Sequence, residues 1–236
     1  MAVGAPSESP AIVVRELDRS GVVPNVQTTT GAFVGNFNWG PVQQATQIPN
    51  ETALVERFGS PDSSNTIEFH GAAYFLRYAS TLQVVREVTS AAFNSYDSDA
   101  NATVLVKNRD NWDDQIAARD AEKHTFLAKY PGTLGNSLKI SMLPADSGDA
   151  TTIFDAWAYK GSFDAAPGTS THAADRTATS DEMHVAIIDE DGLIGGTKGA
   201  VLETFPFVSL ALGALNADGS TNYIKDVINN SSEYVW

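Results

Sequence analysis

The chain contains no cysteine, which excludes disulfide bonds, thiolate metal sites and cysteine nucleophiles. It also has little positive charge, because 15 Lys and Arg stand against 29 Asp and Glu, for a formal net charge of −14 at pH 7. Such an excess of negative charge repels nucleic-acid phosphates and anionic lipid surfaces. The composition therefore argues against direct nucleic-acid binding and leaves packing as the source of stability.

Long apolar runs are missing as well. Residues 1–10 lack the basic and apolar segments of a secretory signal. The longest largely apolar stretch, residues 205–215, is far shorter than the roughly 20 residues that span a bilayer. Hydrophobic residues nevertheless make up 42% of the chain, which is typical of a folded globular protein. We expect a protein that folds in a cytoplasm, without secretion or membrane insertion.

The first half of the chain favours alternating strands and helices. Strands are predicted over residues 32–37 and 82–88. Between them, one helix begins after the N-cap Asn50 and stops at Gly59, and a second covers residues 66–80 with an apolar stripe at helical spacing. This order indicates an α/β (α+β) fold with a mixed sheet flanked by helices.

The second half is predicted to be richer in strands. A hairpin is expected to join strands at 183–189 and 200–205, and residues 89–102 and 161–180 are expected to be loops, the latter mobile and on the surface. The other expected elements are strands at 103–107, 138–143, 151–160 and 233–236, the last cut off at the end of the chain, and helices at 108–130 and 222–230.

These elements suggest a division of the chain into three parts. Residues 1–21 form an extended N-terminal arm, residues 22–90 an α/β core segment, and residues 91–236 a second, β-rich inserted or peripheral lobe. Because the last predicted strand begins just as the chain ends, we expect this lobe to be incomplete at its C-terminus.

Two motifs of nucleotide and metal sites are approached but not completed. Residues 192–199 are similar to a phosphate-binding loop, but Thr197 stands where the second glycine is required and Gly199 where the hydroxyl residue is required. The acids before this segment are similar to the opening of a calcium loop, but they are consecutive and no Glu closes the loop. We interpret them as a solvated hairpin turn, with a weak cation site at Asp189 and Asp191 as the alternative.

Catalytic groups are equally sparse. The four histidines are too far apart for a metal-ligand spacing, and His70 in a helix and His184 in a strand are expected to be structural. A hydrolase would need Asp189 or Asp191 to meet His184 in a cleft. We therefore predict no enzymatic activity and no cofactor.

The most suggestive segment lies near the N-terminus, where a short β-rich run follows Pro10. It is either the first strand of the local sheet or an arm that adds a strand to a neighbouring subunit, since an isolated strand needs an edge to satisfy its backbone. This candidate strand-exchange arm consists of Ile12, Val13, Val14, Arg15, Glu16 and Leu17.

Four segments, taken in order, resemble the tail sheath proteins of contractile bacteriophages of the myovirus type. Each is made of common residues, and their order carries the resemblance. They are SPAIVVRE at 9–16, TTGAFVG at 29–35 with WGP at 39–41, LVERFGSP at 54–61 with AYFL at 73–76 and LQVVR at 82–86, and KYPGTLGNSL at 129–138.

The resemblance implies a structural subunit of the virion tail, assembled in the host cytoplasm. Such subunits stack as hexameric rings in a helical sheath and contract to drive the tail tube through the host envelope. The implied partners are other copies of the chain, exchanging strands through residues 12–17, together with the tail tube protein and the baseplate and tail terminator proteins. The alternative is a baseplate or other tail-associated binding protein with sheath-like ancestry. Members of the family usually continue well past this length.

Overall fold

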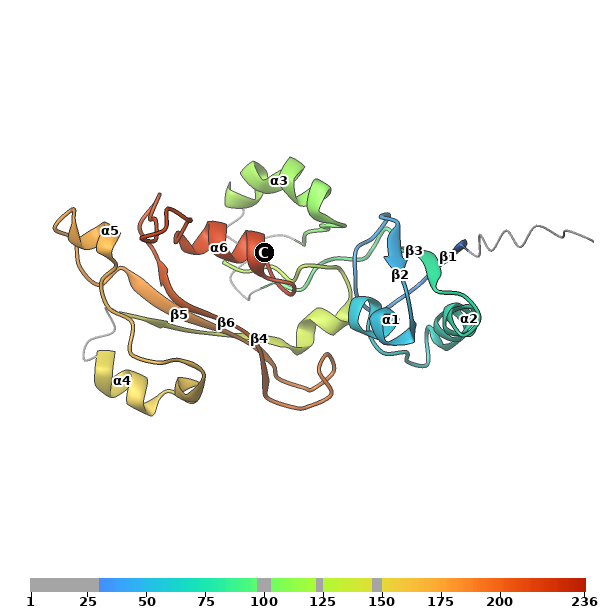
Figure 1. The fold of residues 1–236 in the computed structure, drawn as a ribbon. Helices are drawn as coiled ribbons and strands as arrows, with labels where there is room; N and C mark the ends of the chain where they lie inside the picture. The colour runs from blue at the N-terminus through green and yellow to red at the C-terminus, as the bar shows by residue number, and fades with distance from the viewer. Residues whose placement is uncertain (1–29, 97–102, 122–124, 146–149) are drawn as a thin grey trace, which may run out of the picture.

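The computed structural model describes residues 30–96, 103–121, 125–145 and 150–236 (Figure 1). The described chain contains two three-stranded sheets, which lie toward opposite ends of the molecule in Figure 1. Helices accompany both sheets, so the predicted mixed α/β fold class is confirmed. The candidate arm at residues 12–17 and the extended segment predicted before residue 30 lie outside the described residues. The three-part division of the chain stays a prediction.

The first sheet has the strand order β1-β3-β2. Strand β1 (Thr30–Gly35) pairs in parallel with β3 (Thr81–Arg86), and β2 (Thr46–Ile48) is antiparallel to β3. Helices α1 (Glu51–Phe58) and α2 (Thr66–Leu76) connect the strands and pack on the sheet, as predicted. Their core consists of Phe37, Ile48, Leu54, Phe58, Phe69, Ala72, Ala73, Leu82 and Val84.

Local signals explain the ends of α1. The Asn50 side chain accepts a hydrogen bond from the amide of Ala53 at 2.9 Å, which satisfies a donor of the first turn. At the other end Gly59 adopts φ 81° and donates its amide to the Val55 carbonyl at 2.8 Å. Both caps were predicted from the sequence, and both are confirmed.

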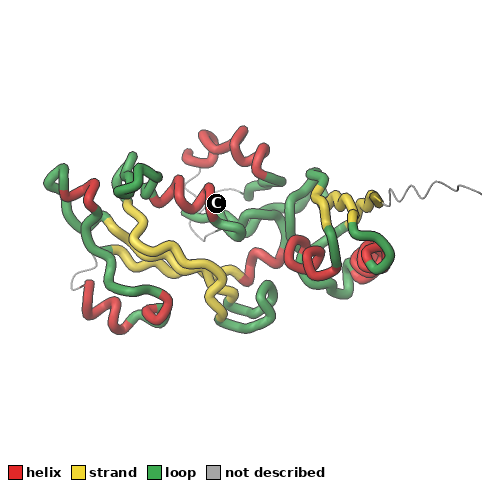
Figure 2. The backbone as a smooth tube through the Cα atoms, in the orientation of Figure 1, coloured by secondary structure: helices red, strands yellow, loops and turns green. Residues whose placement is uncertain are grey.

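The second sheet has the order β4-β5-β6 and is antiparallel throughout. Strand β4 spans Leu138–Pro144, β5 spans Glu182–Asp189 and β6 spans Ala200–Ser209, and the tube in Figure 2 follows the three strands side by side. Helix α6 (Ile224–Ser231) packs its apolar side on this sheet through Ile228. The strand at 138–143, the hairpin and the C-terminal helix are therefore confirmed.

The strand predicted at 151–160 is wrong. This segment forms helix α4 (Ala150–Ala156) and the 3-10 turn η2 (Lys160–Ser162). Its β-branched residues favour a strand locally, but the helix places the Phe154 ring edge-on to the buried ring of His184, 5.9 Å between centroids. Tertiary packing therefore overrides local propensity here.

The loop predicted at 161–180 is mostly irregular but contains a further helix, α5 (Thr171–Ala174). Ser170 caps this helix by accepting from the amide of Ala173 at 3.1 Å. The Asp181 carboxylate in turn accepts hydrogen bonds from the amide and hydroxyl of Ser170 at 2.8 and 2.7 Å. The segment is thus tied to the start of β5.

Three predictions for the connecting region need correction. Residues 103–107 form no strand. Instead, the Asn94 side chain donates to the Val106 carbonyl at 3.1 Å and accepts from the Val106 amide at 2.7 Å. The predicted helix at 108–130 is confirmed only as α3 (Arg109–Ala121), since residues 125–130 are not helical. The predicted final strand is reduced to a single bridge between Ala128 and Val235.

No helix among the described residues is both long and apolar enough to cross a membrane.

Candidate assembly surface

Strand β1 presents an unprotected sheet edge. It pairs only with β3 among the described strands, and its register with β3 is continuous from Thr30 to Gly35. Its sequence, TGAFVG, contains no charge and no proline. Charged residues and prolines are the features by which sheet edges normally avoid pairing with other chains, and β1 lacks both. The edge is therefore able to accept a further strand.

The edges of the second sheet differ from β1. Strand β6 carries Pro206, which has no amide to donate, and its pairing with β5 shows two register shifts. Strand β4 carries Lys139 and ends at Pro144. These devices discourage strand addition, so β1 is the better acceptor edge.

The face of β1 that points away from the helices is apolar. Phe33 packs against the core, so the alternation of a strand places Val34 on the opposite face, where it is 63% exposed. Val85 lies directly across from Val34 on β3 and is only partly buried. Solvent contact with this part of the sheet is costly in free energy, which favours coverage by another segment or subunit.

Helix α2 also shows an apolar surface on the side away from the core. Ile67 is 86% exposed and Tyr74 is 59% exposed, and they lie seven residues apart on one stripe. Tyr78, just past the helix, continues this stripe at 90% exposure. A helix that is apolar on both sides is normally buried on both sides. Because α2 covers the sheet face opposite Val34, Val34 and this stripe lie on opposite sides of the sheet–helix layer. With the β1 edge, they make up what we call the candidate assembly surface.

The suspected cation site at Asp189 and Asp191 is not formed. The Asp189 carboxylate is buried and accepts hydrogen bonds from the amides of Leu193, Ile194 and Gly195 at 2.7 to 3.1 Å. Burial raises the pKa of Asp189, but these hydrogen bonds and one from Ser137 more than offset the effect and leave the pKa below its usual value. Its oxygens therefore organise the turn by accepting amide protons, as the hairpin interpretation requires.

The Asp191 side chain takes no part in the hydrogen bonds that organise the turn. Its side chain is exposed and lies 3.6 Å from Lys198 as a surface ion pair. The described residues contain no group of three or more His, Cys, Asp or Glu side chains arranged to hold a metal ion.

His184 is structural, as predicted. Its ring is fully buried and stacks on Phe163 with 4.4 Å between centroids. Nε2 lies 2.7 Å from the Ala165 carbonyl and Nδ1 accepts from the Phe207 amide at 3.1 Å, a pattern that requires a neutral ring. Burial lowers the pKa of His184 accordingly. Neither Asp189 nor Asp191 contacts this ring, so the hydrolase arrangement is not formed. His70 lies on α2 as predicted, but its side chain is exposed.

Arg86 is a structural residue that sequence reasoning missed. It is 2% exposed and donates to the carbonyls of Phe37, Gly40 and Pro131 at 2.6, 2.9 and 2.7 Å, with a longer contact of 3.3 Å to Asn38. Burial lowers its pKa to about 10, so it remains charged at neutral pH. Because Pro131 belongs to the segment leading into β4, Arg86 ties the first sheet to the second.

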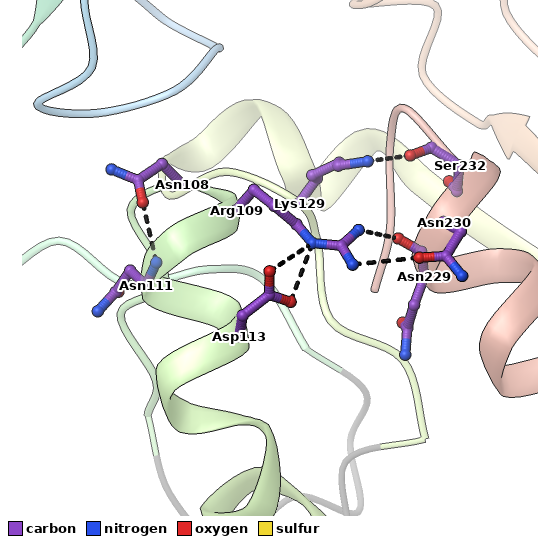
Figure 3. Close-up of polar contacts among 8 residues, drawn as sticks. All are labelled: Asn108, Arg109, Asn111, Asp113, Lys129, Asn229, Asn230 and Ser232. Carbon is purple, nitrogen blue, oxygen red and sulfur yellow. Dashed lines mark hydrogen bonds and ion pairs between the residues drawn. The ribbon is translucent and has the colours of Figure 1, made fainter.

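A second polar joint surrounds the end of α6 (Figure 3). Arg109 of α3 donates to the Asn229 carbonyl at 2.8 Å and to Oδ1 of Asn230 at 3.1 Å, while Asp113 holds its Nε at 2.9 Å. Lys129 donates to the carbonyl of Ser232. These cations satisfy carbonyls at the helix C-terminus, where positive charge is favourable.

Comparisons with known proteins agree with the resemblance seen in the sequence. Residues 28–86 match the family described as tail sheath protein Gp18 domain III N-terminal region. This range contains the first sheet and both of its helices, and therefore the whole candidate assembly surface.

The chain is 31% identical over 202 residues to the tail sheath protein of Salmonella phage ViI, covering 85% of this chain and 29% of that protein. It is 41% identical over 80 residues to the tail sheath protein of Enterobacteria phage T4, covering 34% of this chain and 12% of the relative. The chain thus spans less than a third of the length of these curated relatives. A solved sheath tail protein, Lin1278 from Listeria innocua, is similar with a TM-score of 0.41 and 14% identity, covering 88% of this chain and 29% of that one.

Proposed function

Because the chain is related in sequence to the tail sheath proteins of phages, we propose that it is a structural subunit of a contractile tail sheath. In this role it polymerises around the tail tube, and contraction of the polymer drives the tube through the host envelope. The observation that carries the proposal is the similarity to the Salmonella phage ViI sheath protein over 85% of this chain.

The candidate assembly surface supports a role in assembly. It combines a strand edge that is uncharged and pairs with no other described strand with exposed apolar side chains at Val34, Ile67 and Tyr74. Large exposed apolar patches mark sites of interaction with other chains or segments. No comparable set of convergent catalytic groups is present among the described residues, and we propose a non-enzymatic role.

Residues 12–17 are proposed as the strand-exchange arm of this subunit. A β-rich segment that folds as a strand satisfies its backbone donors and acceptors by pairing with a sheet edge. The β1 edge is one that leaves such pairing open, because it has no proline, charge or register shift to prevent it.

The finer proposal concerns partners and location. Copies of the chain form hexameric rings that stack helically in the virion tail, in contact with the tail tube protein and bounded by baseplate and tail terminator proteins. A baseplate or other tail-associated binding protein of sheath-like ancestry is the second candidate, favoured by the exposed aromatic side chains of Tyr74 and Tyr78.

Electron microscopy of the purified protein tests the proposal. We expect rings or helical tubes from the wild type, and folded monomers after deletion of residues 1–21. Val14→Pro removes one backbone donor from residues 12–17 without shortening the chain and should weaken polymerisation, whereas Val3→Pro, outside residues 12–17, serves as the matched control.

Other outcomes point elsewhere. Monodisperse wild-type monomers at high concentration contradict the sheath proposal and favour the binding-protein alternative. Loss of the folded state after the deletion, measured by circular dichroism, identifies residues 12–17 as an internal strand instead of an arm.

A further inference from the structure

A polar groove lies where α1, α3 and the end of α6 approach one another. Its volume is about 260 Å³, and its lining includes Arg57, Arg109, Lys129 and Glu233. Three cations therefore meet one carboxylate on the walls of this groove, in a chain whose net charge is −14. The groove is a local exception to the acidic character of the molecule.

Most charges around the groove already have partners. Arg109 is paired with Asp113, as Figure 3 shows, and Lys129 donates to the Ser232 carbonyl. Glu203, whose charge acts on Lys129, accepts hydrogen bonds from the Ser232 hydroxyl at 2.7 Å and from the Glu233 amide at 2.8 Å.

Arg57 differs from the other two cations of the groove. Its guanidinium lies over the Tyr130 ring, 5.7 Å from the centroid, and forms no ion pair with any carboxylate that the structure describes. A guanidinium presents five donors in a planar fork that matches a carboxylate. The groove is therefore suited to bind an acidic side chain from outside the described residues.

The β5–β6 turn presents such a side chain. The buried Asp189 carboxylate holds the amides of Leu193, Ile194 and Gly195, so the backbone of the turn is already ordered before any contact is made. Asp191 projects from this turn with its side chain 55% exposed, and its ion pair with Lys198 at 3.6 Å is exposed to solvent and weak. A pre-ordered turn loses little conformational entropy on binding.

The groove and the turn lie on different sides of the molecule. In Figure 1 the turn between β5 and β6 lies below the second sheet, whereas α3 and α6 lie above it. The turn of one copy therefore does not reach the groove of the same copy. A contact between them joins two different surfaces of two subunits, and repeated contacts of this kind build rings or open helical polymers instead of closed dimers.

We propose that this groove binds the Asp191 carboxylate of a second copy of the chain, with Arg57 as the cation that receives it. The inference rests on the proposed function, because it requires that copies of the chain associate. It adds an electrostatic contact between subunits that is separate from residues 12–17 and from the candidate assembly surface.

A charge exchange tests the contact. We expect Arg57→Glu and Asp191→Arg each to weaken self-association at least tenfold, measured by sedimentation at low ionic strength, and the double variant to regain most of the wild-type affinity. Arg176→Glu and Asp155→Arg make the same charge changes on exposed residues elsewhere and serve as matched controls.

Each outcome decides the matter. Recovery in the double variant alone supports the contact. If the single variants associate as their controls do, or the double variant is no better than the singles, the contact is wrong and the assembly proposal stands. If the wild type remains monomeric, both proposals fail. Circular dichroism of each variant separates loss of contact from loss of fold.

Discussion

Replacement of Arg86 by methionine should be among the most destabilising single substitutions in the chain. The guanidinium is buried and donates to four backbone carbonyls. Three of them belong to the turn at residues 37–40, which follows β1, and the fourth belongs to Pro131 in the segment before β4. Methionine fills much of the same volume but offers no donor. Arg86→Met therefore leaves several buried acceptors without their partner.

The expected magnitude follows from two opposing effects. Each buried acceptor that loses its partner costs about 1–3 kcal/mol. The variant no longer has to bury a charge, which returns part of that cost, as the lowering of the Arg86 pKa by burial indicates. A net loss of about 3–5 kcal/mol is expected, a large share of the roughly 5–15 kcal/mol that stabilises a typical domain.

Urea unfolding at pH 7, monitored by circular dichroism and tryptophan fluorescence, measures this loss. Arg86→Lys keeps the charge but not the planar fork, so its stability should lie between those of the wild type and Arg86→Met. Arg77→Met, at an exposed arginine on the end of α2, should remain close to the wild type. A loss below about 1 kcal/mol for Arg86→Met, within the range of ordinary surface substitutions, would refute the reasoning.

Two further predictions concern buried titratable groups. Asp189→Asn places an amide donor against the turn amides and should lower the free energy of unfolding by about 1–3 kcal/mol at neutral pH, whereas Asp191→Asn should leave it unchanged. Because the native pKa of Asp189 is lowered, the stability that its carboxylate contributes should be lost as the pH falls through and below about 4. The native pKa of His184 is also lowered, so the unfolded state takes up its proton first, and the melting temperature should fall below about pH 6.5. His184→Phe should flatten that decline, and an unchanged pH profile would contradict the assignment.

The elements predicted correctly are those with short-range signals. Asn50 and Gly59 define α1 because a cap depends on the residue itself and on amides three or four positions away. The hairpin of β5 and β6 follows from two apolar runs around Asp191-Gly192. In each case the interacting groups lie close together in the sequence.

The wrong predictions involve partners that are distant in sequence. The segment at 103–107 has the composition of a strand, but the group that pairs with Val106 is the side chain of Asn94. The segment at 151–160 has the composition of a strand, but Phe154 reaches the ring of His184 from a helix. Local propensity does not reveal such contacts.

The same argument explains why the polar joints were missed. Arg86, Arg109 and Lys129 donate to backbone carbonyls, which every residue carries and no side-chain pattern identifies. The position of Arg86 in the strand pattern nevertheless indicates its role. It follows Leu82 and Val84 at the spacing of a strand, so it falls on the face that those two residues bury. A charge at a core-facing position needs several buried acceptors, and the turn at residues 37–40 and the loop at residue 131 supply them.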